Sequence, residues 1–333
     1  MRAFALLGPR EAVVREVEPP VAGPGQVVVD VERVGLCGTD VEFYTGEMAY
    51  LKQGHASYPI RLGHEWCGTV ASVGDGVDAA WRGRRVTGDT MLGCGRCARC
   101  LGGRHHVCED RFEIGIRGGW PGALAEQLLV PATALLALPD EVGPTAGALV
   151  EPGGNALRAA MATGARPGMR VLVWGPGTIG RLAAAFARAA GAEVHLAGLT
   201  AGEGVWSAEE LPDLPYEAII DATNAATVPK AALDLVEPGG RVVYIGLAAT
   251  PSAIDTRRLV LKDVTAVGVL GGSQGLRGAV EHYRSGAVDP EPLVAATVPL
   301  ERAGDVLAGW RPPGAGPGPK IHVNPALPPG PTV

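Results

Sequence analysis

The sequence lacks any concentration of positive charge. Its 333 residues carry a formal net charge of -6, and no run of Lys and Arg stands out against that balance. Because a nucleic-acid-binding surface needs a basic field, the charge pattern argues against nucleic acid as a partner. Charged residues make up only 19% and hydrophobic residues 47% of the chain. This composition excludes a disordered chain and predicts a globular protein.

Long apolar segments are also missing. The N-terminal stretch from Met1 to Leu7 is too short for the apolar part of a signal peptide before Gly8, Pro9 and charged residues follow. Elsewhere Gly, Pro or charge interrupts each apolar run before the roughly 20 residues that cross a bilayer. The sequence therefore predicts a cytoplasmic protein without a membrane partner.

A chain of this length exceeds what one hydrophobic core usually organises, so two domains are expected. Residues 1–150 are rich in short β-like runs bounded by Gly and Pro. Residues 151–287 alternate apolar strands with Ala-rich helices, and the Pro-rich, strand-like pattern returns at 288–333. We predict an α/β protein in which a doubly wound parallel sheet of Rossmann type follows a β-rich domain, with the C-terminal segment returning to the first domain.

Four of the six cysteines lie close together, in the pattern Cys94-x2-Cys97-x2-Cys100-x7-Cys108. Four thiols on such a loop can surround one tetrahedral zinc ion and leave no open position, so we predict a structural zinc. An iron–sulfur cluster and a nucleic-acid-binding zinc ribbon use similar ligands, but the acidic charge and the rest of the chain disfavour both. Without an export signal, this spacing favours a metal in a reducing compartment over disulfides.

A second set of potential metal ligands is spread over separate loops. Cys37 supplies a thiol, His64 and Glu65 supply an imidazole and a carboxylate, and Glu151 adds a further carboxylate. Mixed ligands of this kind form an open zinc site with room for water or a substrate oxygen. Such a zinc acts as a Lewis acid towards an alcohol. Each residue alone has an ordinary structural explanation, so the prediction depends on their combination with a nicotinamide site.

A glycine-rich turn follows the apolar strand 171–174 and precedes an Ala-rich helix. Gly175 permits the tight turn, Gly177 lets the backbone approach a pyrophosphate, and Gly180 allows close packing of helix on strand. Without that strand and helix, an ordinary Gly-rich turn would explain the motif as well. We predict NAD or NADP as cofactor. The expected contacts are Gly175, Gly177, Thr178, Ile179, Gly180, Thr200 and Gly246.

The second strand of the same domain ends at Gly198-Leu199-Thr200, where NAD-specific enzymes carry an acid for the ribose hydroxyls. No arginine follows to hold a 2′-phosphate, so the choice between NAD and NADP stays open. Only about twenty residues separate this strand from the next at Tyr216, which leaves little room for the usual helix. We therefore expect a shortened adenine side.

These motifs together resemble the zinc-containing medium-chain alcohol and polyol dehydrogenases. The resemblance spans nearly the whole chain and includes Cys37-Gly38-Thr39-Asp40, Gly63-His64-Glu65, the cysteine loop and Glu151-Pro152. It implies a GroES-like catalytic domain, metal binding by Cys37 and His64, and variable ligation by Glu65 and Glu151. It also implies that Thr39 hydrogen-bonds the reacting oxygen and passes on its proton.

The substrate is indicated less sharply. Glu42 stands where many of these enzymes have a proton-relaying His, and its ordinary pKa of about 4.3 would leave it ionised. The segment around Glu42 and that around Glu113 are similar to the glucose dehydrogenase branch, whereas the segment after Glu151 looks more like threonine dehydrogenases. We predict Glu113 and Glu151 as substrate contacts, because carboxylates bind several hydroxyls or an ammonium. A solvated loop position for Glu42 is the alternative. Cys67 matches no motif and is expected in the core.

The resulting hypothesis is a dehydrogenase with two zinc ions per chain, NAD or NADP, and a secondary alcohol of a sugar, polyol, cyclitol or amino alcohol as substrate. We expect a homodimer or homotetramer. A non-catalytic zinc and nicotinamide-binding sensor, or a partner-binding protein, is the alternative of a different class. Cys37, His64 and the complete cysteine loop argue against a zinc-free double-bond reductase of similar fold.

Overall fold

The computed structural model describes residues 1–329, and the chain divides into two compact units. The first unit joins Met1–Glu151 to the C-terminal segment from Asp289, and the second is Pro152–Val288. Within residues 1–329, every helix is too short or too polar to cross a lipid bilayer.

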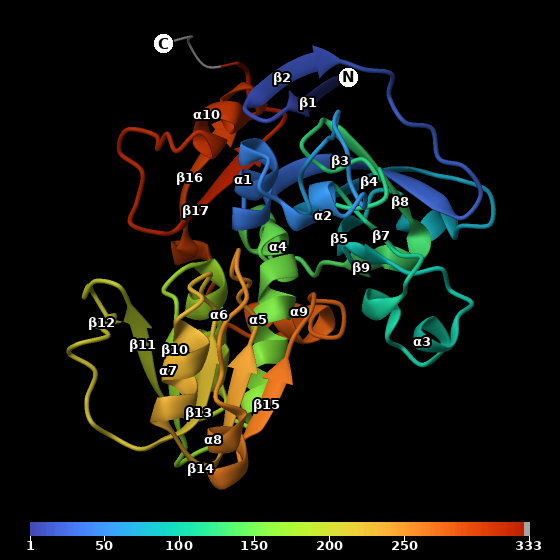
Figure 1. Ribbon diagram of the computed structural model, residues 1–333. Coiled ribbons are helices and arrows are strands. Elements are labelled where there is room, and N and C mark those ends of the chain that lie inside the picture. Colours follow the sequence, from blue (N-terminus) through green and yellow to red (C-terminus); the bar gives the residue numbers. More distant parts are fainter. Residues whose placement is uncertain (330–333) are drawn as a thin grey trace. The chain divides into compact units, whose positions relative to one another are not determined.

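A seven-stranded sheet organises the first unit (Figure 1), with strand order β16-β17-β3-β4-β5-β9 and with β8 paired to β3. Its strands are β3 (Gln26–Gly35), β4 (Glu65–Val73), β5 (Arg85–Gly88), β8 (Gln127–Pro131), β9 (Leu135–Ala137), β16 (Val294–Pro299) and β17 (Lys320–Asn324). Two small sheets pair β1 (Arg2–Gly8) with β2 (Glu11–Glu16) and β6 (Met91–Leu92) with β7 (Phe112–Glu113). The helices are α1 (Gly38–Thr45), α2 (Ala49–Lys52), α3 (Ala98–Leu101), α4 (Pro144–Ala148) and α10 (Ala303–Leu307).

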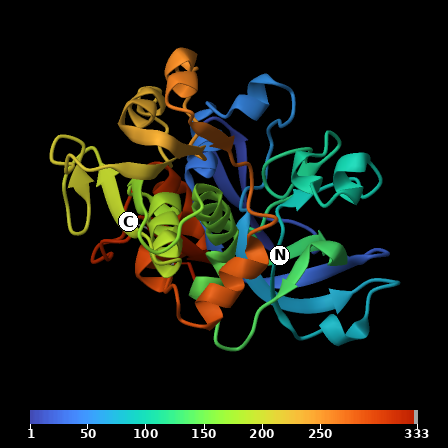
Figure 2. The ribbon, with the colours of Figure 1, turned by 90° about the horizontal axis from the view of Figure 1, so that it is seen from below.

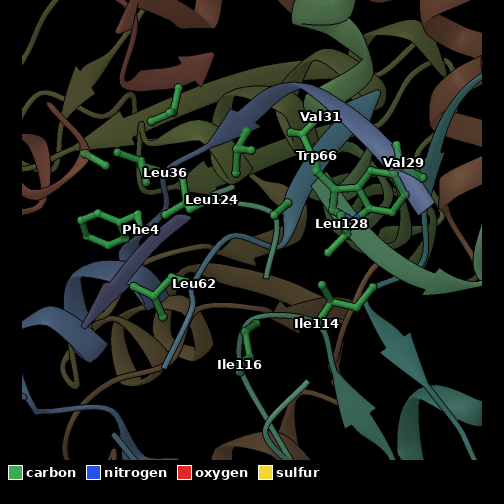
Figure 3. Close-up of a cluster of buried hydrophobic side chains, with 14 of the residues drawn as sticks. Phe4, Val29, Val31, Leu36, Leu62, Trp66, Ile114, Ile116, Leu124 and Leu128 are labelled. Atoms are coloured by element: carbon green, nitrogen blue, oxygen red, sulfur yellow. The ribbon is translucent and has the colours of Figure 1, made fainter. Parts of the chain in front are cut away.

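The central strands of this sheet have an apolar face and a polar face. Trp66, Val34 and Val323 belong to the main hydrophobic core, which Figure 3 shows with Phe4, Leu124 and Leu128 among the packed side chains. Val323 pairs with Val34, and Val34 pairs with Trp66, so these side chains share one face. Since successive side chains alternate across a strand, Gly35, Glu65, Lys320 and His322 belong to the opposite face.

Helix α4 packs on β3, β4 and β5. The Cys67 thiol donates a hydrogen bond to the Pro144 carbonyl oxygen at 3.1 Å. Burial raises the pKa of Cys67 to about 12, so the thiol stays protonated and unreactive. This agrees with the core position expected for Cys67.

The second unit contains a six-stranded parallel sheet in the order β12-β11-β10-β13-β14-β15. Its strands are β10 (Arg170–Trp174), β11 (Glu193–Gly198), β12 (Trp206–Ser207), β13 (Tyr216–Asp221), β14 (Val236–Tyr244) and β15 (Thr265–Gly268). Its helices are α5 (Val150–Thr163, which begins in the first unit), α6 (Thr178–Ala189), α7 (Val228–Leu235), α8 (Thr256–Leu261) and α9 (Leu276–Arg284).

Helices cover both faces of this parallel sheet. Helix α6 packs on β10 and β11, whereas α7 packs on β13 and β14 from the other side, with α8 beside it (Figure 2). The predicted doubly wound α/β fold is confirmed. Between β11 and β13 the two-residue strand β12 is the single regular element of this described segment. The expected shortening on the adenine side is therefore present in the fold.

Candidate metal and nucleotide sites

Three potential metal ligands converge in the first unit. Cys37 precedes α1, His64 directly precedes β4, and Glu65 is the first residue of β4. One ligand atom from each of these three residues lies within 4.8 Å of the other two. Cys37 Sγ and His64 Nε2 are 3.1 Å apart. A thiolate, an imidazole and a carboxylate form a donor set that suits zinc and leaves coordination positions open.

Asp40 lies beside two of these ligands. Its Oδ2 accepts a hydrogen bond from the Cys37 backbone N–H at 2.9 Å, which caps α1. Its Oδ1 lies 3.6 Å from His64 Nδ1, on the side of the ring away from Cys37. A carboxylate behind a metal-binding histidine orients the ring and makes it a stronger ligand. The motif alone predicts no role for Asp40, although its place three residues after Cys37 is a capping-box signal.

The charges around His64 favour a cation in this site. Burial alone would lower the pKa of His64, but the neighbouring Cys37 thiolate and Asp40 carboxylate raise it well above its ordinary value. A positive charge, either a proton or a metal ion, is thus stabilised between Cys37 and His64.

Lys320 is a member of the site that the motifs do not predict. Its ammonium donates hydrogen bonds to Glu65 Oε1 at 2.8 Å, to Glu65 Oε2 at 2.7 Å and to the Leu36 carbonyl oxygen at 2.9 Å. Both charged side chains are 3% exposed. Burial alone would lower the pKa of Lys320, but Glu65 and Cys37 raise it. The Glu65 carboxylate therefore lies between the other ligands and a buried ammonium.

Gly35 provides the space for this ion pair. A Cβ atom added at Gly35 would lie 2.1 Å from Glu65 Oε2. That separation is far below van der Waals contact, so any side chain at this position would displace the carboxylate. Gly35 has no signal in the sequence beyond its place before the Cys37 motif.

Thr39 and Glu42 lie on α1, the helix that follows Cys37. Thr39 is half-buried in the first turn of the helix, and its contact with a substrate oxygen stays a prediction. Glu42 is also half-buried, and burial, followed by the charge of Glu47, raises its pKa. The pKa of Glu42 therefore lies above the ordinary value expected for it, because the carboxylate is partly withdrawn from solvent and close to the charge of Glu47.

The two remaining predicted carboxylates are placed differently. Among residues 1–329, this group of potential metal ligands contains Cys37, His64 and Glu65, and Glu151 lies outside it in the first turn of α5. Glu113 is 3% exposed, and its Oε1 accepts hydrogen bonds from Arg111 Nε at 2.8 Å and from the Tyr50 hydroxyl at 3.2 Å. Its negative charge is therefore balanced by Arg111. Metal binding by Glu151 and substrate contacts of Glu113 and Glu151 stay predictions.

The cysteine loop has the spacing of a tetrahedral metal site. The four Sγ atoms of Cys94, Cys97, Cys100 and Cys108 lie within 4.8 Å of one another, and none forms a disulfide. The Cys94–Cys100 and Cys97–Cys108 sulfur distances are 3.9 and 3.8 Å. Zinc–sulfur bonds of about 2.3 Å in a tetrahedron place sulfur atoms about 3.8 Å apart. Backbone N–H groups of Arg96 and Cys97 lower the pKa of Cys94 to about 6, which favours its thiolate.

The glycine-rich turn of the second unit lies at the carboxyl end of β10. Gly175 has a φ of 102°, and a Cβ at Gly180 would lie 1.8 Å from the Gly175 carbonyl oxygen. By contrast, a Cβ at Gly177 would meet nothing within 4 Å. Backbone conformation explains Gly175, and close packing explains Gly180. The open space at Gly177 leaves room for an approaching phosphate. No side chain caps α6, so its first N–H groups are directed to this space.

The other predicted cofactor contacts lie in the second unit near the carboxyl ends of parallel strands. Thr178 and Ile179 form the first turn of α6, and Thr200 is exposed just after β11. Gly246 follows β14, and a Cβ there would lie 1.8 Å from the Thr223 carbonyl oxygen. This edge of a doubly wound sheet is where dinucleotides bind. Their contacts with a cofactor stay predictions.

Comparison with known proteins gives consistent matches. Residues 23–140 match the family profile of the alcohol dehydrogenase GroES-like domain, and residues 207–285 match that of zinc-binding dehydrogenases. L-Threonine 3-dehydrogenase of Idiomarina loihiensis is 31% identical over 294 residues, which cover 81% of this chain and 84% of that protein.

Solved structures match both units. A putative zinc-binding dehydrogenase from Sinorhizobium meliloti, bound to NADP, is 28% identical with a TM-score of 0.87 over 97% of this chain and 99% of that one. Alcohol dehydrogenase TADH from Thermus sp. ATN1 is 26% identical with a TM-score of 0.86 over the same shares of the two chains.

Proposed function

Because the chain belongs to the family of zinc-containing medium-chain alcohol and polyol dehydrogenases, we propose that it oxidises a secondary alcohol of a sugar, polyol, cyclitol or amino alcohol. NAD or NADP accepts the hydride, and the reaction is reversible. The convergence of Cys37, His64 and Glu65 within 4.8 Å is the observation that carries this proposal. The relative from Idiomarina loihiensis is named for threonine, which carries both an amino group and a hydroxyl. Amino alcohols are therefore among the first substrates to test.

Cys37 and His64 would hold the catalytic zinc, and Asp40 would keep the His64 ring in its orientation. When bound, the metal supplies a Lewis acid that favours loss of the alcohol proton. The Thr39 hydroxyl accepts that proton in a hydrogen bond but cannot keep it. Asp40, next to Thr39, is fully buried, so we propose that the half-buried Glu42, one turn later on α1, passes the proton towards solvent.

The cysteine loop would hold a second zinc in a structural role, because four thiolates leave no position for a substrate. Gly177 and the uncapped start of α6 would receive the cofactor pyrophosphate. With neither an acid nor an arginine at 198–200, the sequence favours neither NAD nor NADP. We also propose a homodimer or homotetramer, which sedimentation analysis would test.

The deciding experiment measures reduction of NAD⁺ and of NADP⁺ by the zinc-loaded protein with a panel of sugars, polyols, cyclitols and amino alcohols. Cys37→Ala is the inactive variant, and Cys67→Ala is its matched control, because Cys67 is buried away from the ligand group. Turnover by the wild type and Cys67→Ala but not by Cys37→Ala is expected. Turnover by Cys37→Ala at the wild-type rate, or none by the wild type with any substrate, would contradict the proposal.

A further inference from the structure

His322 is buried without a hydrogen-bond partner. Its side chain is 0% exposed, and neither Nδ1 nor Nε2 has a partner among the described residues. Burial, and then the charges of Lys320 and Arg33, lower its pKa to about 3, so the ring is neutral and keeps one nitrogen lone pair. Because an unpaired polar group inside a protein is destabilising, such a residue calls for a physical reason.

The register of three strands places His322 beside the Glu65–Lys320 pair. His322 lies opposite Gly35 in the β17–β3 pairing, and Gly35 lies opposite Glu65 in the β3–β4 pairing. Residues in register share a face, and Lys320 shares it too, because it precedes His322 by two positions on one strand. Gly35 contributes no side chain, and the Glu65 carboxylate fills the space above it. Glu65 and His322 thus flank Gly35 from either side.

Lys320 and the metal site share the Glu65 carboxylate. All three Lys320 donors are used, two on Glu65 and one on the Leu36 carbonyl oxygen. The same carboxylate lies within 4.8 Å of the ligand atoms of Cys37 and His64. If a Glu65 oxygen turns to a metal, at least one Lys320 donor loses its acceptor. An incompletely paired ammonium in a buried site is costly, so a second acceptor would make that turn easier.

We propose that His322 is a positioning residue, which accepts a hydrogen bond from Lys320 when Glu65 turns towards the catalytic metal. This inference depends on the proposed function, since it requires a metal at Cys37 and His64. His322 stabilises the arrangement in which Glu65 faces the metal and thereby raises the affinity of the site for zinc. A hydrophobic residue at position 322 would suit the buried surroundings but could not accept this hydrogen bond.

The test measures zinc affinity of the full-length protein by competition with a chromogenic chelator. The binding that Cys37→Ala loses relative to the wild type is assigned to the catalytic site. His322→Leu should weaken zinc binding there about tenfold, in line with the loss of one hydrogen bond to a charged group. His322→Gln keeps an acceptor oxygen and should bind zinc nearly as the wild type does. In a Glu65→Gln background, His322→Leu should have no further effect, because the carboxylate it assists is gone.

The outcomes separate this inference from the proposed function. Two results would show a purely structural role for His322 and overturn this inference without affecting the proposed function. One is equal zinc affinity in the wild type and His322→Leu. The other is a loss of zinc affinity on His322→Leu that is the same with and without Glu65→Gln. If His322→Leu does not fold, His322→Phe serves as the apolar variant. A wild-type protein that binds no zinc at Cys37 would overturn both the inference and the proposed function. Cobalt(II) substitution adds a spectroscopic readout, because carboxylate ligation alters the visible bands of the bound ion.

Discussion

Replacing Lys320 by Met would leave the Glu65 carboxylate buried without its ammonium. The two groups are 2.7 Å apart and each is 3% exposed, so the carboxylate cannot be hydrated where it stands. Removing one partner of a buried ion pair typically costs about 3–5 kcal/mol. For a unit of this size, each kcal/mol lowers the unfolding temperature by about 2–4 °C, so the expected loss is roughly 6–20 °C.

The chain offers a matched control for this substitution. Lys230 and Asp234 form an ion pair of 2.9 Å on α7, but their side chains are 66% and 31% exposed. An exposed pair at this helical spacing contributes about 0.3–0.5 kcal/mol, so Lys230→Met should lower the unfolding temperature by less than about 2 °C. Lys320→Arg keeps the charge and should fall between the two Met variants.

Thermal unfolding followed by circular dichroism, at equal zinc content, measures all three variants. Lys320→Met should be several times more destabilising than Lys230→Met, because the Lys320–Glu65 pair is buried, whereas Asp234 is partly exposed and also pairs with Arg258. Similar unfolding temperatures for these two variants would refute this expectation and would mean that water or a rearranged Glu65 compensates the lost charge.

Three further predictions concern metal, proton and cofactor. Elemental analysis should find two zinc ions per chain, and one zinc in fully active enzyme would contradict this. Mild chelation should abolish activity before it lowers the unfolding temperature, whereas Cys97→Ala should lower the unfolding temperature. Since the pKa of Glu42 is raised, kcat should fall as pH decreases through that pKa, and Glu42→Gln should lower kcat at neutral pH and remove this limb. An unchanged pH profile would make Glu42 a bystander. Gly177→Val should leave the unfolding temperature unchanged and weaken cofactor binding tenfold or more, whereas Gly180→Val should destabilise the fold; equal cofactor affinity in wild type and Gly177→Val would contradict a phosphate at this turn.

The parts of the molecule that could be predicted are those whose signals are local in sequence. The strand, the glycine turn and the Ala-rich helix from Val171 onwards are predicted from such signals, and the structure places the helix at Thr178–Ala189. The missing helix before Tyr216 followed from chain length alone. The cysteine loop is equally local, because its spacing by itself limits how far apart four thiols can lie.

The parts that could not be predicted depend on pairing between distant segments. Lys320 and Glu65 are 255 residues apart in sequence, and a lysine in a Pro- and Gly-rich segment is normally expected in solvent. Only the strand register shows that Lys320 reaches Glu65 over Gly35. Likewise, the hydrogen bond that Glu113 accepts from the Tyr50 hydroxyl joins segments 63 residues apart in sequence.

The C-terminal strand completes the charge balance of the catalytic site. Asp40, Glu65 and a metal-binding Cys37 thiolate bring three negative charges together, and His64 as a ligand is neutral. A divalent zinc ion and the Lys320 ammonium supply three positive charges, so the assembled group is neutral. Without a metal the balance is negative, and a proton on His64 compensates part of it, which agrees with the raised pKa of that residue. Strand β17 lies between β16 and β3 and carries Lys320 to Glu65, so residues 1–151 alone would hold the ligands but not the charge that balances them.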